Sequence, residues 1–230
     1  MEMKELKMDF EEEQNNEYDE EIIDQISEIE NKKDGFKLFG LYDVSDIKMV
    51  DLGMRRYINL DQKLLVKSHG RVREKFGKAK INLLEVLANL IAVPGHRGKK
   101  HKIQTSWKSG KYSQNMKIVI RTLNLVEDKM KINPIQILVS ALENAAPMDG
   151  ITVIEYGGAR YPQAVDMSPL RRVTMTLRFM VQGAYDKSFN KKTTIEQALA
   201  TEIINAYSKN MDSNAMSKKR DSEKQADSAR

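Results

Sequence analysis

The fold is decided by residues 151–169, which read ITVIEYGGARYPQAVDMSP. Two strand-like runs flank Gly157-Gly158, and two adjacent glycines supply the positive φ angles of a tight hairpin turn. Because Pro162 cannot donate a hydrogen bond in a central strand, we expect residues 151–167 to form an exposed two-stranded ribbon. Such a ribbon is marginally stable alone and needs a helix behind it or a partner in front of it.

On both sides of this ribbon, apolar residues recur every three or four positions, which is typical of helices that bury one face. Capping signals predict where helices begin, namely Asn82 with Glu85, Asn133 before Pro134, Ser168 before Pro169, and Thr193 with Glu196. A short helix is expected around Asp61–Lys67 and a loose final helix in the last 23 residues. The predicted fold class is mainly α, a bundle of five to six helices with one protruding two-stranded β-ribbon.

Charge divides the chain into three parts. Residues 1–30 contain 13 Asp or Glu and 2 Lys, a net charge of −11, whereas the whole chain of 230 residues carries +5, so the rest carries +16. We expect residues 1–35 to be an acidic, disordered extension, residues 36–80 a basic arm, and residues 81–230 a helical core with the ribbon. The acidic extension is either a solvated tail or a segment that meets a basic neighbour and discourages premature RNA binding.

Several classes of protein are disfavoured by composition. The chain has no cysteine, which excludes a disulfide framework and any thiolate metal site. There is no apolar run long enough for a membrane helix and no secretory signal, so we expect a cytoplasmic protein. The three histidines, His69, His96 and His101, lie in basic segments without a nearby carboxylate to orient them. We therefore expect no enzyme, no metal, no cofactor and no small-molecule substrate.

A polyanionic partner is indicated by two basic segments. Residues 55–80 contain 9 Lys or Arg against 2 acids, and residues 95–117 contain 7 Lys or Arg and no acid. Aromatic residues are interleaved with these cations, and this combination suits phosphate neutralisation with base stacking. Ordinary solvated charges and a DNA-binding regulator that uses helix 168–186 are the competing interpretations. Against the regulator, the sequence has no dimerisation heptads and no compact helix-turn-helix spacing.

Four runs then resemble one known family. They are Glu143–Pro147, Ile154–Pro162, Val165–Arg172 and Leu177–Ala184, and they are similar to the seventh protein of the small ribosomal subunit. Arg56–Lys63 and Ser68–Arg71 resemble the archaeal and eukaryotic branch of that family. The likeness spans about residues 35–230. It implies a helical core with a β-ribbon arm, as the residues themselves predict.

The resemblance also implies a function. The chain would be a structural constituent of the small ribosomal subunit that binds the 3′ major domain of its rRNA, nucleates head assembly, and lies near exit-site tRNA, the mRNA path and neighbouring small-subunit proteins. The ribbon tip, comprising Gly157, Gly158, Ala159, Arg160 and Tyr161, would face tRNA or mRNA, although Tyr161 could instead pack on the bundle. The residues expected to bind rRNA are Arg55, Arg56, Tyr57, Lys63, Lys67, His69, Arg71, Arg73, Lys75, Lys78 and Lys80 in the arm, Arg97, Lys99, Lys100, Lys102, Trp107, Lys108 and Lys111 in the loop, and Arg171, Arg172 and Arg178 on the helix after the ribbon.

Overall fold

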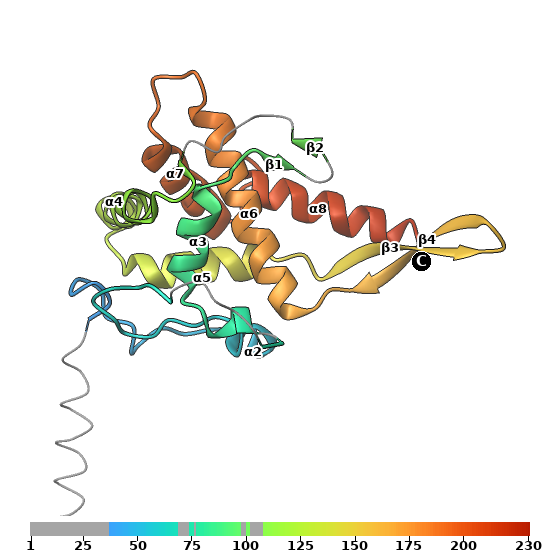
Figure 1. Ribbon diagram of the computed structural model, residues 1–230, viewed down its shortest axis with the longest axis horizontal. Coiled ribbons are helices and arrows are strands. Elements are labelled where there is room, and N and C mark those ends of the chain that lie inside the picture. Colours follow the sequence, from blue (N-terminus) through green and yellow to red (C-terminus); the bar gives the residue numbers. More distant parts are fainter. Residues whose placement is uncertain (1–36, 69–73, 76, 98–99, 102–107) are drawn as a thin grey trace, which may run out of the picture. The chain divides into compact units, whose positions relative to one another are not determined.

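The computed structural model describes residues 37–68, 74–75, 77–97, 100–101 and 108–230 (Figure 1). The chain divides into two compact units, Met1–Ser45 with Gln62–Leu64, and Asp46–Asp61 with Leu65–Arg230. Each unit is described by itself.

In the smaller unit, a tight turn joins Leu38 to Tyr42. The backbone N–H of Leu38 donates to the carbonyl of Tyr42 at 2.8 Å, and Phe39 and Gly40 take positive φ angles of 58° and 72° between them. The N–H of Phe39 donates to the carbonyl of Lys63 at 3.1 Å, which brings the two segments of this unit together.

The larger unit is mainly helical, which confirms the predicted fold class. Among the described residues, six α-helices of nine residues or more correspond to the predicted ones, and one further α-helix is a single turn. In chain order, the described elements are α2 (Leu52–Arg55), the 3₁₀ helix η2 (Gly77–Lys80), α3 (Leu83–Ile91), β1 (His96–Arg97), β2 (Lys100–His101), α4 (Tyr112–Met130), α5 (Pro134–Ala145), β3 (Asp149–Tyr156), β4 (Ala159–Asp166), α6 (Pro169–Ser188), α7 (Ile195–Tyr207) and α8 (Asn214–Asp227) (Figure 1).

Helix α7 lies at the centre of the bundle and packs against α4, α5, α6 and α8. Its buried face includes Ala198, Ala200 and Ala206, whose small side chains allow neighbouring helices to approach closely. Leu142 of α5 and Leu177 of α6 are fully buried and fill the space around it. The helices therefore share one hydrophobic core from which the loops and the ribbon project.

The ribbon forms as the sequence predicts. Strands β3 and β4 pair antiparallel from Asp149 opposite Asp166 to Tyr156 opposite Ala159. Gly157 and Gly158 make the two-residue turn with φ angles of 58° and 82°, a geometry that residues with a Cβ adopt only with strain. Nearly all of its side chains are exposed on both faces, and Figure 1 shows the ribbon extending away from the helices of its unit.

The helix predicted at Asp61–Lys67 is wrong, because that segment has no helical hydrogen bonds. Its flank is extended beside the start of α3, where the N–H of Leu83 donates to the carbonyl of Asn59 at 2.8 Å and the Asn82 side chain donates to the carbonyl of Asp61 at 3.2 Å. These bonds occupy carbonyls that a helix would need. Tertiary pairing has overridden a weak local preference.

Smaller differences concern helix ends. Asn82 caps α3 as predicted, but Glu85 accepts a hydrogen bond from Ser68 at 2.9 Å instead of closing a capping box. Helix α7 is capped by Thr194 rather than Thr193. Helix α4 begins at Tyr112, inside the segment predicted as a loop.

Candidate nucleic-acid interface

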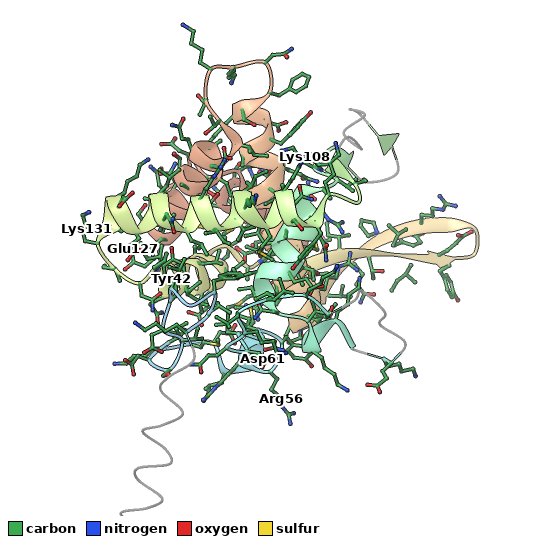
Figure 2. All side chains as sticks on the ribbon, turned by 60° about the vertical axis from the view of Figure 1, so that its left-hand side comes forward. Tyr42, Arg56, Asp61, Lys108, Glu127 and Lys131 are labelled. Atoms are coloured by element: carbon green, nitrogen blue, oxygen red, sulfur yellow. The ribbon has the colours of Figure 1, made fainter. Side chains whose placement is uncertain are left out.

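Arg55 and Arg56 lie at the end of α2, and both are exposed. The carboxylate of Asp51 caps this short helix by accepting from the N–H of Gly53 at 2.9 Å. Glu143 of α5 accepts from the N–H of Asp51 at 3.1 Å, so the helix is tied to the bundle. Arg56 points away from the helices of its unit (Figure 2). The bundle thus presents two guanidinium groups on a fixed turn.

The two basic segments meet at the start of α4. The hydroxyl of Tyr112 donates to the carbonyl of Val66, and the Nζ of Lys67 lies 5.8 Å from the centre of the Tyr112 ring. The side chain of Asn115 donates to the carbonyl of Lys108 at 3.3 Å, which ties the end of the basic loop to α4. The arm and the loop, separate in sequence, are therefore joined at one place.

Lys108 and Lys111 are exposed beside this junction, and Figure 2 shows Lys108 at the opposite end of α4 from Lys131. Burial raises the pKa of Tyr112 to about 12, and the nearby carboxylate of Glu85 adds to the shift. Tyr112 therefore remains a neutral hydrogen-bond donor at physiological pH, while the lysines around it supply the positive charge.

Further cations surround the 3₁₀ helix η2. Lys75 and Lys78 are exposed and have no ion-pair partner among the described residues. Lys80 differs, because its Nζ lies 2.6 Å from a carboxylate oxygen of Glu74. That hydrogen bond lowers the pKa of Glu74, so this carboxylate stays ionised. Phosphate binding at Lys80 would have to compete with this neighbour.

The three predicted arginines of helix α6 differ in exposure and in ion pairing. Arg171 and Arg178 are exposed and have no ion-pair partner in the described part of the chain. Arg172 is only 11% exposed, and its guanidinium lies 3.0 Å from the carboxylate of Asp51. We conclude that Arg172 holds the α2 segment against α6, whereas its two neighbours remain available to a ligand.

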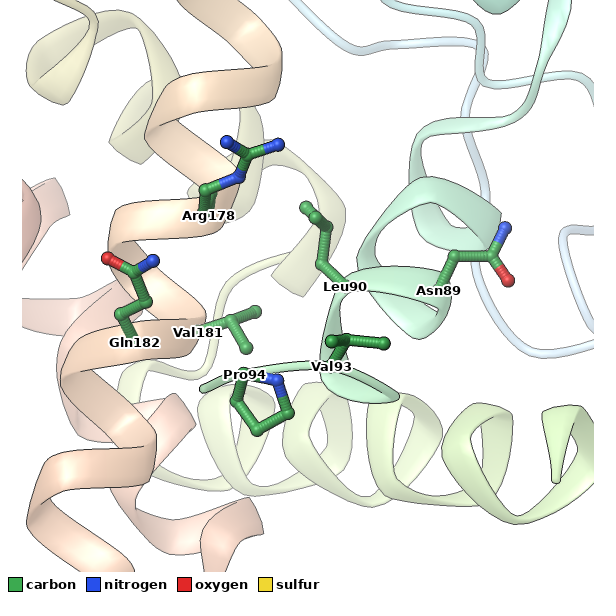
Figure 3. Close-up of a pocket in the computed structure, with 7 residues that line it drawn as sticks. All are labelled: Asn89, Leu90, Val93, Pro94, Arg178, Val181 and Gln182. Carbon is green, nitrogen blue, oxygen red and sulfur yellow. The ribbon is translucent and has the colours of Figure 1, made fainter. Parts of the chain in front are cut away.

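Arg178 lines an apolar pocket of about 300 Å³ between α3 and α6. Figure 3 shows Arg178 and Val181 on one side, Leu90 opposite them, and Val93 with Pro94 at its base. An unpaired nucleobase needs an apolar or planar surface together with a cation for its phosphate. The pocket offers both kinds of contact.

At the ribbon tip, Tyr156 and Tyr161 are 81% and 59% exposed, so neither packs on the bundle. Glu155 and Arg160 face each other across the strands, with 3.6 Å between their charged atoms. The tip therefore offers aromatic surface together with a partly neutralised cation.

The remaining predicted residues divide into two groups. Lys63 belongs to the smaller unit, and Tyr57 is half-buried. The backbones of Arg97 and Lys100 pair across β1 and β2, which the sequence had indicated only as loop. The predictions for His69, Arg71, Arg73, Lys99, Lys102 and Trp107 lie outside the described residues.

Sequence reasoning did not single out Lys191 and Lys192, which are exposed in the loop between α6 and α7. Two adjacent lysines shortly before a helix cap are a recognisable signal for a basic loop. Like the other exposed cations, they extend the positive surface of the unit.

Other kinds of site find no support within the described ranges. No three or more His, Asp or Glu side chains gather there as metal ligands would. Every helix in those ranges is too short or too polar to span a bilayer.

Comparison with known proteins identifies the family. A family model described as ribosomal protein S7p/S5e matches residues 54–230. The small ribosomal subunit protein uS7 of Nanoarchaeum equitans is 49% identical over 195 residues, which cover 84% of this chain and 98% of that protein. The proteins of the same name from Picrophilus torridus and Methanosphaera stadtmanae are 39% and 37% identical, with the same two coverages. The resemblance seen in the sequence is confirmed, and the chain belongs to the ribosomal protein S7p/S5e family.

Proposed function

We propose that the chain is a structural protein of the small ribosomal subunit and binds the subunit's rRNA through the cations of α2, η2, the start of α4 and one face of α6. The observation that carries this proposal is the set of exposed cations without ion-pair partners among the described residues, which includes Arg55, Arg56, Lys78, Arg171 and Arg178. Clustered unpaired cations bind phosphates and release counterions. The chain acts as part of a particle and not as an enzyme.

The finer proposal follows from family membership. The bundle binds the 3′ major domain of small-subunit rRNA, nucleates assembly of the head and contacts neighbouring small-subunit proteins, in the cytoplasm. The ribbon tip lies near exit-site tRNA and the mRNA path. The exposed tyrosines and the length of the ribbon support this role, because a two-stranded ribbon with both faces exposed gains stability from a partner.

A salt titration tests rRNA binding. We expect a folded fragment of the 3′ major domain to bind more tightly than duplex DNA of equal length at matched salt, with a steep dependence on salt concentration. Replacing Arg55 and Arg56 with alanine should lower the slope of log K against log salt by about 2, since each lost phosphate contact removes about 0.9.

The matched control is Lys129→Ala with Lys224→Ala, which removes the same charge from exposed positions outside the proposed interface. Equal slopes for the two double variants would show that only net charge matters. Equal affinity for RNA and DNA would favour the DNA-binding interpretation.

A separate experiment tests the ribbon. Tyr161→Ala in reconstituted small subunits should weaken exit-site tRNA binding and leave binding of the free protein to rRNA unchanged. Loss of rRNA binding with intact tRNA binding would place the ribbon on the rRNA instead.

A further inference from the structure

We propose that helix α8 is a strut that sets the direction of the ribbon, and that Ser222, Glu223 and Arg230 at its far end are positioning residues for whatever the ribbon tip contacts. Figure 1 shows α8 running from the bundle to the root of the ribbon, where the last residue of the chain also lies. The consequence for tRNA rests on the proposed function, but the strut itself does not.

The ribbon cannot hold its own direction. Two strands of eight residues with both faces exposed bury little apolar surface, and an isolated hairpin is marginally stable in water. At the root, the N–H of Met167 donates to the carbonyl of Met148 at 2.9 Å, a bond that joins the two ends of the ribbon to each other and not to the bundle. Its orientation must therefore come from contacts with other elements.

Those contacts come from α8. The Ser222 hydroxyl donates to the carbonyl of Asp149 at 3.1 Å, and Glu223 accepts from the N–H of Met148 at 3.3 Å. The Arg230 guanidinium lies 2.7 Å from the carboxylate of Asp149. We call these three side chains of α8 and its following residues the root clamp. In addition, the N–H of Ala164 on β4 donates to the carbonyl of Ala229 at 3.4 Å, so both strands are held.

Beside the clamp, one side of the root is not covered by packed side chains. A cavity of about 570 Å³, open to the surface, is lined by residues of both strands, by Arg171 and Met175 of α6, and by Ser222 and Gln225 of α8. Closely packed side chains resist tilting, whereas a space of this size does not. The polar contacts of the root clamp therefore limit movement of the ribbon over the cavity.

The other end of α8 is anchored more firmly. The carboxylate of Glu202, fully buried on α7, accepts from the N–H of Asn214 at 3.0 Å and lies 2.6 Å from the Nζ of Lys187. The Asn214 side chain donates to the carbonyl of Phe179 at 2.8 Å. The start of α8 thus moves with α6 and α7, and a rigid helix transmits their position to the ribbon.

A small tilt at the root is amplified at the tip. Strand β3 has eight residues, so at about 3.3 Å per residue its tip lies roughly 23 Å from the root. A tilt of about 10° would move the tip by roughly 4 Å, more than the tolerance of a hydrogen bond. Weak surface contacts at the root therefore have a large effect on what the tip can reach.

Paired spin labels on the full chain measure this movement. The chain has no cysteine, so Ala159→Cys at the tip and Glu127→Cys on α4 give one labelled pair. In the clamp variant, Ser222→Ala, Glu223→Ala and Arg230→Ala, the distance distribution should widen by about 4 Å or more. The matched control, Arg220→Ala with Asp221→Ala on the same helix, leaves the net charge equally unchanged and should keep the narrow distribution. An unchanged distribution in the clamp variant, or equal widening in the control, overturns the proposal.

If the clamp variant does not fold, exchanging the charges of Asp149 and Arg230 tests their ion pair separately. Asp149→Arg should widen the distribution, and adding Arg230→Asp should narrow it again. If adding Arg230→Asp does not narrow the distance distribution, the ion pair does not hold the ribbon and the proposal is overturned.

Reconstituted subunits then separate the two proposals. A wider distribution with weaker exit-site tRNA binding supports both the strut and the tRNA-facing ribbon. A wider distribution with unchanged tRNA binding supports the strut and counts against the tRNA role.

Discussion

Gly183 is the position where one methyl group should disturb three helices. It lies on α6 facing α7 and α8, and a Cβ added there would meet the Cβ of Asn214 at 2.6 Å and Oε1 of Glu202 at 2.8 Å. Helix propensity alone predicts that Gly183→Ala stabilises the protein by about 1 kcal/mol. The contacts predict the opposite, because the Cβ of Asn214 cannot rotate away, and the buried carboxylate of Glu202 is held by the N–H of Asn214 and by Lys187.

The magnitude follows from two costs. Overpacking a dense core costs about 1–3 kcal/mol. Moving Glu202 also weakens its ion pair with Lys187, and leaving a buried charge without its partner costs about 3–5 kcal/mol in full. Because the neighbouring side chains relax in part, and because alanine favours the helix by about 1 kcal/mol, we expect the free energy of unfolding to fall by about 2–4 kcal/mol. For a chain of this size that lowers the thermal midpoint by roughly 4–16 °C.

Thermal and urea unfolding of the full chain, followed by circular dichroism, provide the assay. Arg171→Ala, on an exposed position of the same helix, is the control and should change stability by less than about 0.5 kcal/mol. A Gly183→Ala protein as stable as the parent would refute the reasoning. Glu202→Ala combined with Gly183→Ala should cost less than the sum of the two single changes, because both disturb the same contacts.

Three further outcomes are expected. Arg172→Ala should lower stability by about 2 kcal/mol, since it leaves the carboxylate of Asp51 unpaired, and thermal unfolding should show this while Arg171→Ala shows almost none. The raised pKa of Tyr112 stabilises the fold below pH 10, and this contribution is lost as the pH rises toward about 12. Urea unfolding at several pH values in this range should therefore show the free energies of unfolding of the parent and of Tyr112→Phe approaching each other. A difference between the two that does not change with pH would contradict the raised pKa of Tyr112. Deleting residues 1–30 raises the net charge from +5 to +16, so affinity for unrelated RNA should rise at low salt and converge with that of the parent at high salt.

Local chemistry made most of the helices and the ribbon predictable. Asn133-Pro134 and Ser168-Pro169 mark helix starts because a capping side chain or a proline suits only that position, and both helices begin there. Gly157-Gly158 predicted the turn because the paired positive φ angles leave few other residues possible. Such signals need no knowledge of the rest of the chain.

Long-range pairing was not predictable in the same way. The backbone from Asn59 to Asp61 is extended because Asn82 and Leu83, more than twenty positions away, donate to its carbonyls, and no local pattern encodes that distance. Residues 214–227 have few apolar side chains and suggested only a loose helix, yet they form α8. Its role depends on Glu202 at one end and Asp149 at the other, which the sequence does not bring together.

The arginines of α6 have different partners because the period of the helix places them on different faces. Arg171 and Arg178 are seven residues apart, so at 3.6 residues per turn they share one face and lie roughly 10 Å apart along the axis. Arg172 is turned by about 100° from Arg171, which directs it to Asp51. The sequence alone presents the three as one basic group.

Two cations about 10 Å apart on a rigid helix can reach different phosphates of one folded RNA. We therefore expect Arg171→Ala and Arg178→Ala to weaken binding to the rRNA fragment by similar factors that multiply in the double variant, with no change in the thermal midpoint. If the double variant binds no worse than either single variant, the two arginines serve a single contact, and the face of α6 that carries both is not the binding surface.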